Sequence, residues 1–217
     1  MHFEVLVEDQ SGKRALDVLI GRIIGSNHTF RVYSYKGIGH IPKDLGQAVD
    51  PKNRMLLNQL LRLLRGYGAT HSGYPDDYSA AVVVVCDLDN KNRDEFRQQL
   101  LNVLNQCSPE PETRFCIAIE EGEAWFLGDI PAIRTAYPKA KSRVLKSYKN
   151  DSICGTWELL ADAVYKGGAS KLKSKGGQAI GAQKSQWAEE VSPHMNVNNN
   201  KSPSFNYFRE RLLGLIR

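Results

Sequence analysis

The sequence predicts an α/β protein with a mostly parallel four-stranded sheet, helices on both faces and a helical C-terminal extension. Strand-like and helix-like segments alternate through the first 120 residues, an order typical of parallel sheets. The segment "YSAAVVVVC" (78–86) is apolar without alternation, as expected of a strand buried on both faces. Beyond about residue 130 no further strand of this kind follows, and the chain becomes basic and helix-like.

The first two strands and the helix between them are predicted within residues 3–35. "FEVLVE" (3–8) has the alternation of a strand, and residues 12–24 place apolar side chains at helical spacing. "TFRVYSY" (29–35) is the second predicted strand. The glycines and proline of "GIGHIPKDLG" then predict a loop.

The second half of the predicted core repeats the helix–strand order. Residues 51–68 open with a proline and close on a glycine, which are start and stop signals for a helix. The buried strand 78–86 follows, then a helix over 93–106 and a fourth strand over 113–119. We therefore expect an α/β core over residues 1–130 and a basic helical extension, residues 131–217, packed on it.

Composition places the chain among reduced globular proteins. Its 217 residues carry a formal net charge of +5, which mildly favours a polyanionic partner. The N-terminus has the pattern of a strand instead of a signal peptide, and no apolar run approaches the roughly 20 residues of a membrane span. The four cysteines show neither a CxxC pair nor a zinc spacing. We expect a cytoplasmic protein without a membrane partner.

Carboxylates follow three of the four predicted strands. Because ligands bind beyond the carboxyl ends of strands in open α/β sheets, we expect these acids to converge at one edge. A single acid there is more often a turn residue or helix cap. Several acids from separate strands favour a divalent ion, and oxygen ligands suit Mg²⁺ or Mn²⁺. The predicted metal ligands are Glu8, Asp87, Asp89, Glu120, Glu121 and Glu123.

Lysines supply the second candidate feature. The glycine-rich segment "YKGGASKLKSKGG" is either a solvated face or a flexible phosphate-binding segment. Lys13 and Lys184 are candidates for neutralising charge on a phosphoryl group. The predicted phosphate or nucleic-acid contacts are Lys13, Lys166, Lys171, Lys173 and Lys175.

The motifs "VLVEDQSGKRAL" and "VVVVCDLDN" together resemble the Toprim domain of topoisomerases, primases and overcoming-lysogenization-defect nucleases. "AIEEGEAWFLGD", "GTWELLADAVYKGG" and the closing "SPSF" helix resemble an uncharacterised bacterial family of Toprim-like proteins, often encoded beside ATPases in phage-defence or mobile islands. The resemblance covers nearly the whole chain. It implies a Toprim-like fold, Mg²⁺-dependent phosphodiester hydrolysis of nucleic acid and an ATPase partner.

By that resemblance Glu8 is a metal ligand or general acid/base, and Asp87 and Asp89 hold the metal. Glu120, Glu121 or Glu123 would serve a second ion. The predicted catalytic residues are Glu8, Asp87, Asp89 and Lys184.

The chain departs from the nuclease-type pattern directly after Glu8. That pattern has a glycine next and often another acid four residues on, where this chain has Asp9 and Gly12. Asp9 is a possible substitute for the absent acid. The departure favours an alternative, a catalytically inactive Toprim-like module that binds nucleic acid or a partner protein. Phosphoryl transfer on a small nucleotide is a third interpretation.

Overall fold

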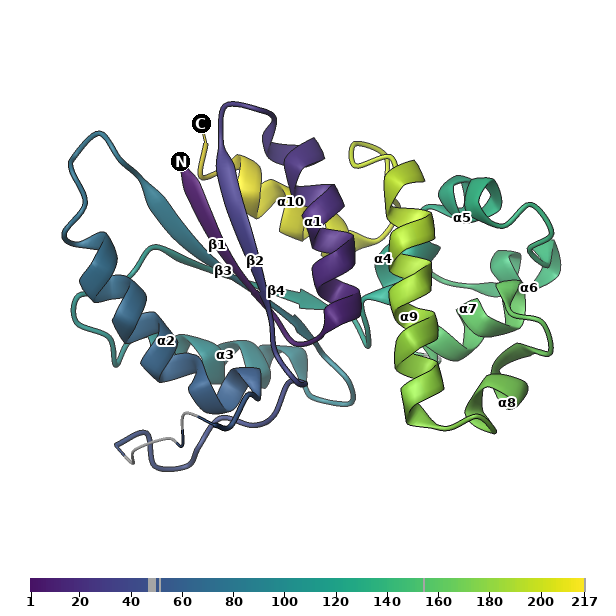
Figure 1. Cartoon of the computed structure of the whole chain (residues 1–217), viewed down its shortest axis with the longest axis horizontal. Coiled ribbons are helices and arrows are strands. Elements are labelled where there is room, and N and C mark those ends of the chain that lie inside the picture. The colour runs from purple at the N-terminus through teal and green to yellow at the C-terminus, as the bar shows by residue number, and fades with distance from the viewer. Residues whose placement is uncertain (47–49, 51, 154, 217) are drawn as a thin grey trace.

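The four strands form one all-parallel sheet in the order β2-β1-β3-β4 (Figure 1). The computed structural model describes residues 1–46, 50, 52–153 and 155–216. The strands are β1 (His2–Val7), β2 (Thr29–Ser34), β3 (Ala80–Asp87) and β4 (Thr113–Ala118). The predicted α/β class and parallel sheet are confirmed.

Helices cover both faces of this sheet, which explains why β3 is apolar throughout. Val83 and Val85 pack with α1 (Gln10–Ile24) on one face. Val82 and Val84 pack on the other face with α2 (Leu56–His71) and α3 (Arg93–Leu104). Both sets of side chains are therefore buried, and no polar position remains along the middle of the strand.

Helix α2 differs from the predicted helix, residues 51–68, at both ends. The predicted N-terminal proline, Pro51, lies outside the described residues, and the helix begins at Leu56. The prediction that it stops at Gly68 is wrong, because the helix continues to His71. Gly68 is buried against the loop that contains Pro109, and a Cβ at this position would collide with the carbonyl oxygen of Pro109. This glycine permits close packing and does not end the helix.

The C-terminal part is helical, as predicted, and its last helix returns to the sheet (Figure 1). Its helices are α4 (Glu123–Leu127), α5 (Ile130–Ala136), α6 (Ser142–Ser147), α7 (Thr156–Val164), α8 (Gly168–Lys173), α9 (Gly177–Val191), a 3₁₀ turn (Ser192–His194) and α10 (Pro203–Leu213). Helix α9 lies beside α1, and α10 packs against β4.

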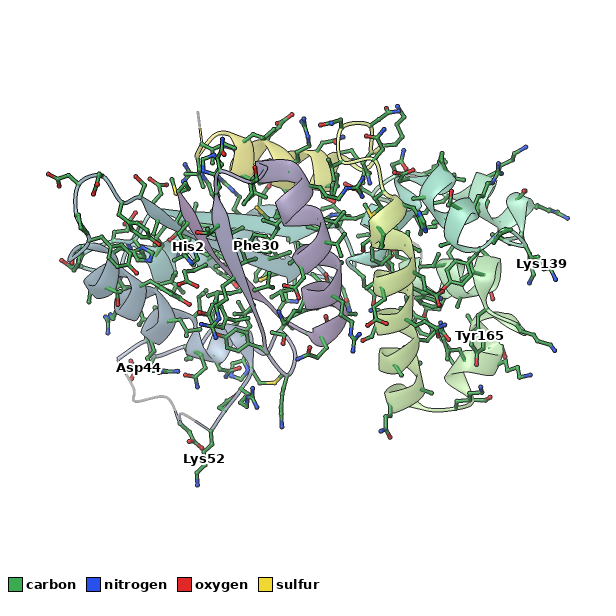
Figure 2. All side chains as sticks on the ribbon, turned by 45° about the horizontal axis from the view of Figure 1, so that its top comes forward. His2, Phe30, Asp44, Lys52, Lys139 and Tyr165 are labelled. Carbon is green, nitrogen blue, oxygen red and sulfur yellow. The ribbon has the colours of Figure 1, made fainter. Side chains whose placement is uncertain are left out.

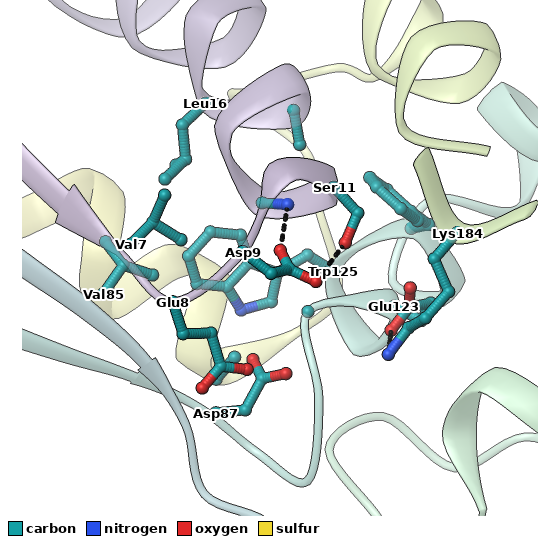
Figure 3. A pocket seen from close by; sticks show the side chains of 15 residues that line it. Val7, Glu8, Asp9, Ser11, Leu16, Val85, Asp87, Glu123, Trp125 and Lys184 are labelled. Carbon is teal, nitrogen blue, oxygen red and sulfur yellow. Dashed lines mark hydrogen bonds and ion pairs between the residues drawn. The ribbon is translucent and has the colours of Figure 1, made fainter. Parts of the chain in front are cut away.

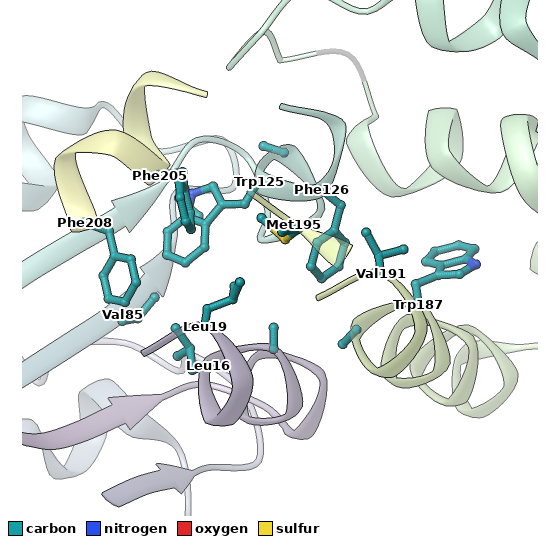
Figure 4. Packing of buried hydrophobic residues seen from close by; sticks show 14 of the residues in the cluster. Leu16, Leu19, Val85, Trp125, Phe126, Trp187, Val191, Met195, Phe205 and Phe208 are labelled. Atoms are coloured by element: carbon teal, nitrogen blue, oxygen red, sulfur yellow. The ribbon is translucent and has the colours of Figure 1, made fainter. Parts of the chain in front are cut away.

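Aromatic packing joins the extension to the core (Figure 4). The Trp125 ring stacks on Phe208 with centroids 5.0 Å apart and meets the edge of Phe205 at 5.5 Å. These side chains share one apolar cluster with Val85 of the sheet and Trp187 of α9. Residues before and after position 130 therefore contribute to the same hydrophobic core. Among the described residues, no helix is both long and apolar enough to cross a membrane.

The strand order creates a crevice between β1 and β3. The chain leaves β1 toward β2 on one side and later returns to place β3 on the other side. The connections that follow β1 and β3 therefore diverge, and the carboxyl ends of these two strands form the topological switch point where ligands of such sheets bind.

Candidate functional site

A small cavity of about 40 Å³ lies at this switch point (Figure 3). Glu8 directly follows β1, and Asp87 is the last residue of β3. Glu123 of α4 and Lys184 of α9 also line the cavity. We call the cavity and these four side chains the inner site. The volume suits an ion with a few waters, since one water needs about 10–15 Å³ by the same measure.

Glu8 and Asp87 face each other in the inner site (Figure 3). Two neighbouring carboxyl groups repel each other when both are ionised, unless a proton or a cation lies between them. Burial, followed by the charge of Glu8, raises the pKa of Asp87 well above its usual range. Burial also raises the pKa of Glu8, whose Oε2 atom is buried without a hydrogen-bond partner among the described residues. Neither carboxyl group forms an ion pair within the described part of the chain, and the Lys184 charge opposes the rise in both pKa values.

Lys184 provides the positive charge on the other side of the inner site. Its Nζ atom lies 3.2 Å from Oε2 of Glu123 and 3.6 Å from Oε1 of Glu121. Burial alone would lower the pKa of Lys184, but Glu123 and Glu121 outweigh that effect and raise it above its usual value. Burial raises the pKa of Glu121 to about 7, while Lys184 opposes the rise. The ammonium group is therefore charged and held by two acids.

Asp9 is occupied as the N-cap of α1 (Figure 3). Its Oδ1 atom accepts a hydrogen bond from the Gly12 backbone N–H at 2.7 Å, and Oδ2 accepts one from the Ser11 hydroxyl at 2.7 Å. A Cβ on Gly12 would lie 2.6 Å from Cγ2 of Val7. Asp9 thus has a structural role, and the space for an acid at position 12 is closed by Val7.

The remaining predicted acids lie around a second, outer hollow of about 250 Å³. The Asp89 carboxylate pairs with the Lys91 ammonium at 2.8 Å. The backbone of Asp89 has a φ of 49°, in the left-handed region. Glu120 accepts hydrogen bonds at 2.9 Å from the backbone N–H groups of Gly155 and Thr156, at the start of α7. The six acids predicted to converge therefore divide into two groups. Among the described residues, no three His, Cys, Asp or Glu side chains form a ready-made metal cluster.

The predicted lysine contacts are dispersed. Lys13 pairs with Asp17 at 2.9 Å on the exposed side of α1. The segment expected to be flexible forms helix α8, which is anchored by the buried side chains of Ala169 and Leu172. Lys173 pairs with Glu158 at 2.9 Å, and its Nζ lies 5.4 Å from the Trp157 ring centroid.

The other lysines of this segment are exposed, and they belong to a region with a strong excess of positive charge. The Nζ atom of Lys175 donates a hydrogen bond to the Tyr165 hydroxyl at 2.7 Å, and Lys166 and Lys171 are exposed. Residues 131–175, here called the basic lobe, contain ten Lys or Arg and three Asp or Glu. Its formal charge is therefore +7, more than that of the whole chain. Lys139 and Tyr165 mark this lobe in Figure 2.

Sequence analysis did not identify two partners of the acids. Lys91 follows Asp89 by two residues, which is a local signal for a charge pair. Thr156 lies 36 residues beyond Glu120, and its hydroxyl also donates to that carboxylate. No sequence pattern connects positions so far apart, so only the fold reveals this contact.

Comparison with known proteins identifies a family for the chain. No curated protein and no solved structure matches the chain significantly. A family model described as "Domain of unknown function (DUF4276)" matches residues 7–213, nearly the whole chain and every residue of the inner site. The chain therefore belongs to the DUF4276 family.

Proposed function

We propose that this protein is a Toprim-like, Mg²⁺-dependent hydrolase of nucleic-acid phosphodiester bonds. The observation that carries the proposal is the Glu8–Asp87 pair at the switch point of a parallel sheet, with a buried glutamate oxygen that lacks a partner among the described residues. A cation is the simplest group that would satisfy this oxygen and separate the two carboxylates.

The residues fit Mg²⁺ or Mn²⁺. Magnesium is commonly held by one or two carboxylates, with water and substrate phosphate completing its coordination. Glu8 and Asp87 would be the protein ligands, and Asp89 lies near enough for its charge to raise the pKa of Glu8. When bound, the ion would stabilise charge on phosphate oxygens and make water more nucleophilic at neutral pH.

The remaining groups of the chain suit a phosphate substrate. Lys184 presents a positive charge to the cavity from α9. The Toprim resemblance gives Glu8 either of two roles, metal ligand or general acid/base, and its place at the end of β1 puts it beside the cavity for either one. In the proposed hydrolysis water adds to phosphorus, the phosphorus–oxygen ester bond breaks, and the leaving oxygen takes up a proton.

The basic lobe supports nucleic acid as the substrate. Its basic residues lie on α5, α6 and α8 and in the loops of this lobe, next to the side of the sheet that carries the inner site (Figure 1). Polyanion binding depends on such clusters of Lys and Arg that contact phosphates. Lys166, Lys171, Lys173 and Lys175 are the proposed phosphate contacts.

A non-catalytic nucleic-acid or protein-binding module is the second candidate. Two observations favour it: Val7 closes the space for an acid at position 12, and Glu121 and Glu123 already pair with Lys184. Such a module has little reason to keep a tight metal site. Divalent-ion affinity therefore discriminates between the two candidates.

The test is cleavage of labelled DNA and RNA, single- and double-stranded, by the full chain with Mg²⁺ or Mn²⁺. We expect metal-dependent cleavage that is lost in Asp87→Ala and retained in Asp76→Ala, a change at an exposed aspartate outside both hollows. Cleavage that survives Asp87→Ala would contradict the assignment. Metal binding without cleavage of any substrate would favour the binding module.

The phage-defence role and the ATPase partner are proposed from the resemblance alone, and the cytoplasmic location from the composition of the sequence. We propose a cytoplasmic protein that acts with an ATPase partner in phage defence. Co-expression with a neighbouring ATPase, followed by measurement of complex formation, tests this part separately.

A further inference from the structure

Two of the acids predicted to bind a second metal ion already hold a cation. Glu123 is only 3% exposed. Its Oε2 atom lies 3.2 Å from the Lys184 ammonium (Figure 3). The same ammonium lies 3.6 Å from Oε1 of Glu121. The Lys184 side chain is 15% exposed. The ion pair is therefore an interior feature of the site, unlike the exposed pair of Lys13 and Asp17.

The geometry disfavours an additional divalent ion at these two carboxylates. A divalent ion and an ammonium group would repel each other if both approached the same oxygens. Displacing the Lys184 ammonium would leave a partly buried charge without its carboxylate partners, which costs free energy. The stem of the side chain starts on α9, and that helix is fixed by the fully buried Trp187, Ala188 and Val191.

The Glu8–Asp87 pair differs from this arrangement. Within the described part of the chain Lys184 forms ion pairs with Glu121 and Glu123 but none with Glu8 or Asp87, whose carboxyl groups face each other (Figure 3). Oε2 of Glu8 remains without a partner among the described residues. Glu121 and Glu123 therefore already have a paired cation, whereas Glu8 and Asp87 have none among the residues that the structure describes.

We propose that Lys184 is a built-in second cation that occupies the position of a second metal ion, so that the protein binds a single divalent ion at Glu8 and Asp87. This inference rests on the proposed function and deepens it. The ammonium group has three N–H donors. Its Nζ atom lies 3.2 Å from Glu123 and 3.6 Å from Glu121, and Lys184 also lines the cavity, where an N–H donor would reach a phosphate oxygen of the substrate. The helical extension, which supplies Lys184, is thereby required to complete the site.

The experiment counts manganese ions bound to the full chain at pH 8, by calorimetry and by electron paramagnetic resonance. We expect one ion for the wild type. Lys184→Met keeps the apolar stem but removes the charge, and we expect it to bind two ions, the second at Glu121 and Glu123. The double variant Lys184→Met/Glu123→Gln should return to one. Lys201→Met, at an exposed lysine before α10, is the matched control and should remain at one.

The outcomes separate this inference from the proposed function. Two ions in the wild type, or a single ion in Lys184→Met, would overturn the inference and leave the proposed function intact. If the wild type binds no ion, both the inference and the proposed function are refuted. Thermal melts check that each variant folds. If Lys184→Met does not fold, anomalous scattering from manganese in wild-type crystals decides: an ion at Glu8 and Asp87 alone supports the inference, and an ion at Glu121 and Glu123 overturns it.

Discussion

Glu120, which lies just beyond β4, binds Thr156 at the start of α7 through both the backbone N–H and the hydroxyl of that threonine. The same carboxylate accepts a hydrogen bond from the Gly155 N–H. Negative charge is favourable at a helix N-terminus, where backbone donors lack partners within the helix. Glu120 therefore joins the end of the sheet to the extension.

This interaction predicts a structural role for Glu120. Replacement by Ala should lower the free energy of unfolding by about 1–3 kcal/mol, because it leaves partly buried N–H groups without their acceptor. Manganese affinity should remain within a factor of about three, well below one tenfold step of about 1.4 kcal/mol. Denaturant unfolding and calorimetry measure the two quantities, with the exposed Glu110→Ala as control. Reduced affinity with unchanged stability would instead make Glu120 a metal ligand.

The Glu8–Asp87 pair predicts that the metal-free protein loses stability as pH rises. The folded-state pKa of Asp87 is raised, mainly by burial and then by Glu8. Between the ordinary aspartate pKa of about 4 and the raised value, the folded state binds more protons than the unfolded state. The free energy of unfolding must therefore fall with rising pH across that window. Melting temperatures from pH 5 to 8, without metal, measure the effect.

Asp87→Asn should flatten this pH dependence. The amide removes the ionisable group, so the variant should gain about 1–3 kcal/mol at pH 8 from the absence of an uncompensated buried charge. Mg²⁺ should raise the melting temperature of the wild type but not that of Asp87→Asn. A variant that is less stable than the wild type at pH 8 without metal would contradict this account of the pair.

Gly12 predicts an exception to helix propensity. Replacing glycine by alanine inside a helix usually stabilises by roughly 0.5–1 kcal/mol. At position 12 the new Cβ would lie 2.6 Å from Val7, so we expect destabilisation by about 1–3 kcal/mol from overcrowding. Gly21→Ala in the same helix is the control, because its Cβ would meet Phe30 at 3.5 Å, an ordinary distance.

A double variant shows whether the crowding is specific. Val7→Ala removes the obstructing methyl groups, so Gly12→Ala in that background should cost less than in the wild type. Additive effects of the two changes would refute the steric explanation.

The two aspartates of the "DLD" motif should differ in their effect on metal affinity. Asp87 belongs to the inner site, whereas Asp89 is paired with Lys91 and its side chain is 43% exposed. We expect Asp87→Asn to abolish measurable manganese binding. Asp89→Asn should weaken binding about 10-fold, the lower limit for residues outside the ligand shell. Calorimetry measures both, and equal reductions would show that Asp89 is a direct ligand.

The basic lobe predicts salt-dependent binding of nucleic acid. Lys166→Glu/Lys171→Glu should weaken binding of a DNA duplex and reduce the slope of log affinity against log salt by about one for each phosphate that is no longer bound. Lys52→Glu is the control, since Lys52 is exposed and lies far from the lobe in Figure 2. Fluorescence anisotropy at several salt concentrations measures the slope. An unchanged slope would exclude these lysines as phosphate ligands.

The sequence by itself determined the parallel sheet and the strand ends. The apolar run of β3 and the alternation of strands with helices are local patterns. Such patterns determine the secondary structure and which faces of a strand or helix are buried. The same patterns placed Glu8 and Asp87 at strand ends on one edge of the sheet, because parallel strands bring their carboxyl ends to the same edge. That β1 and β3 are neighbours is decided by the fold.

Only the tertiary structure decided which charges meet. Glu120 binds Thr156, Glu123 binds Lys184, and Asp9 caps α1 instead of facing the cavity. The first two interactions join residues far apart in the chain, and their distances depend on how the extension packs on α1 and β4. Hydrogen bonds and ion pairs act over a few ångströms in space. The local sequence therefore identifies the candidate acids, but their partners depend on distances that only the folded chain sets.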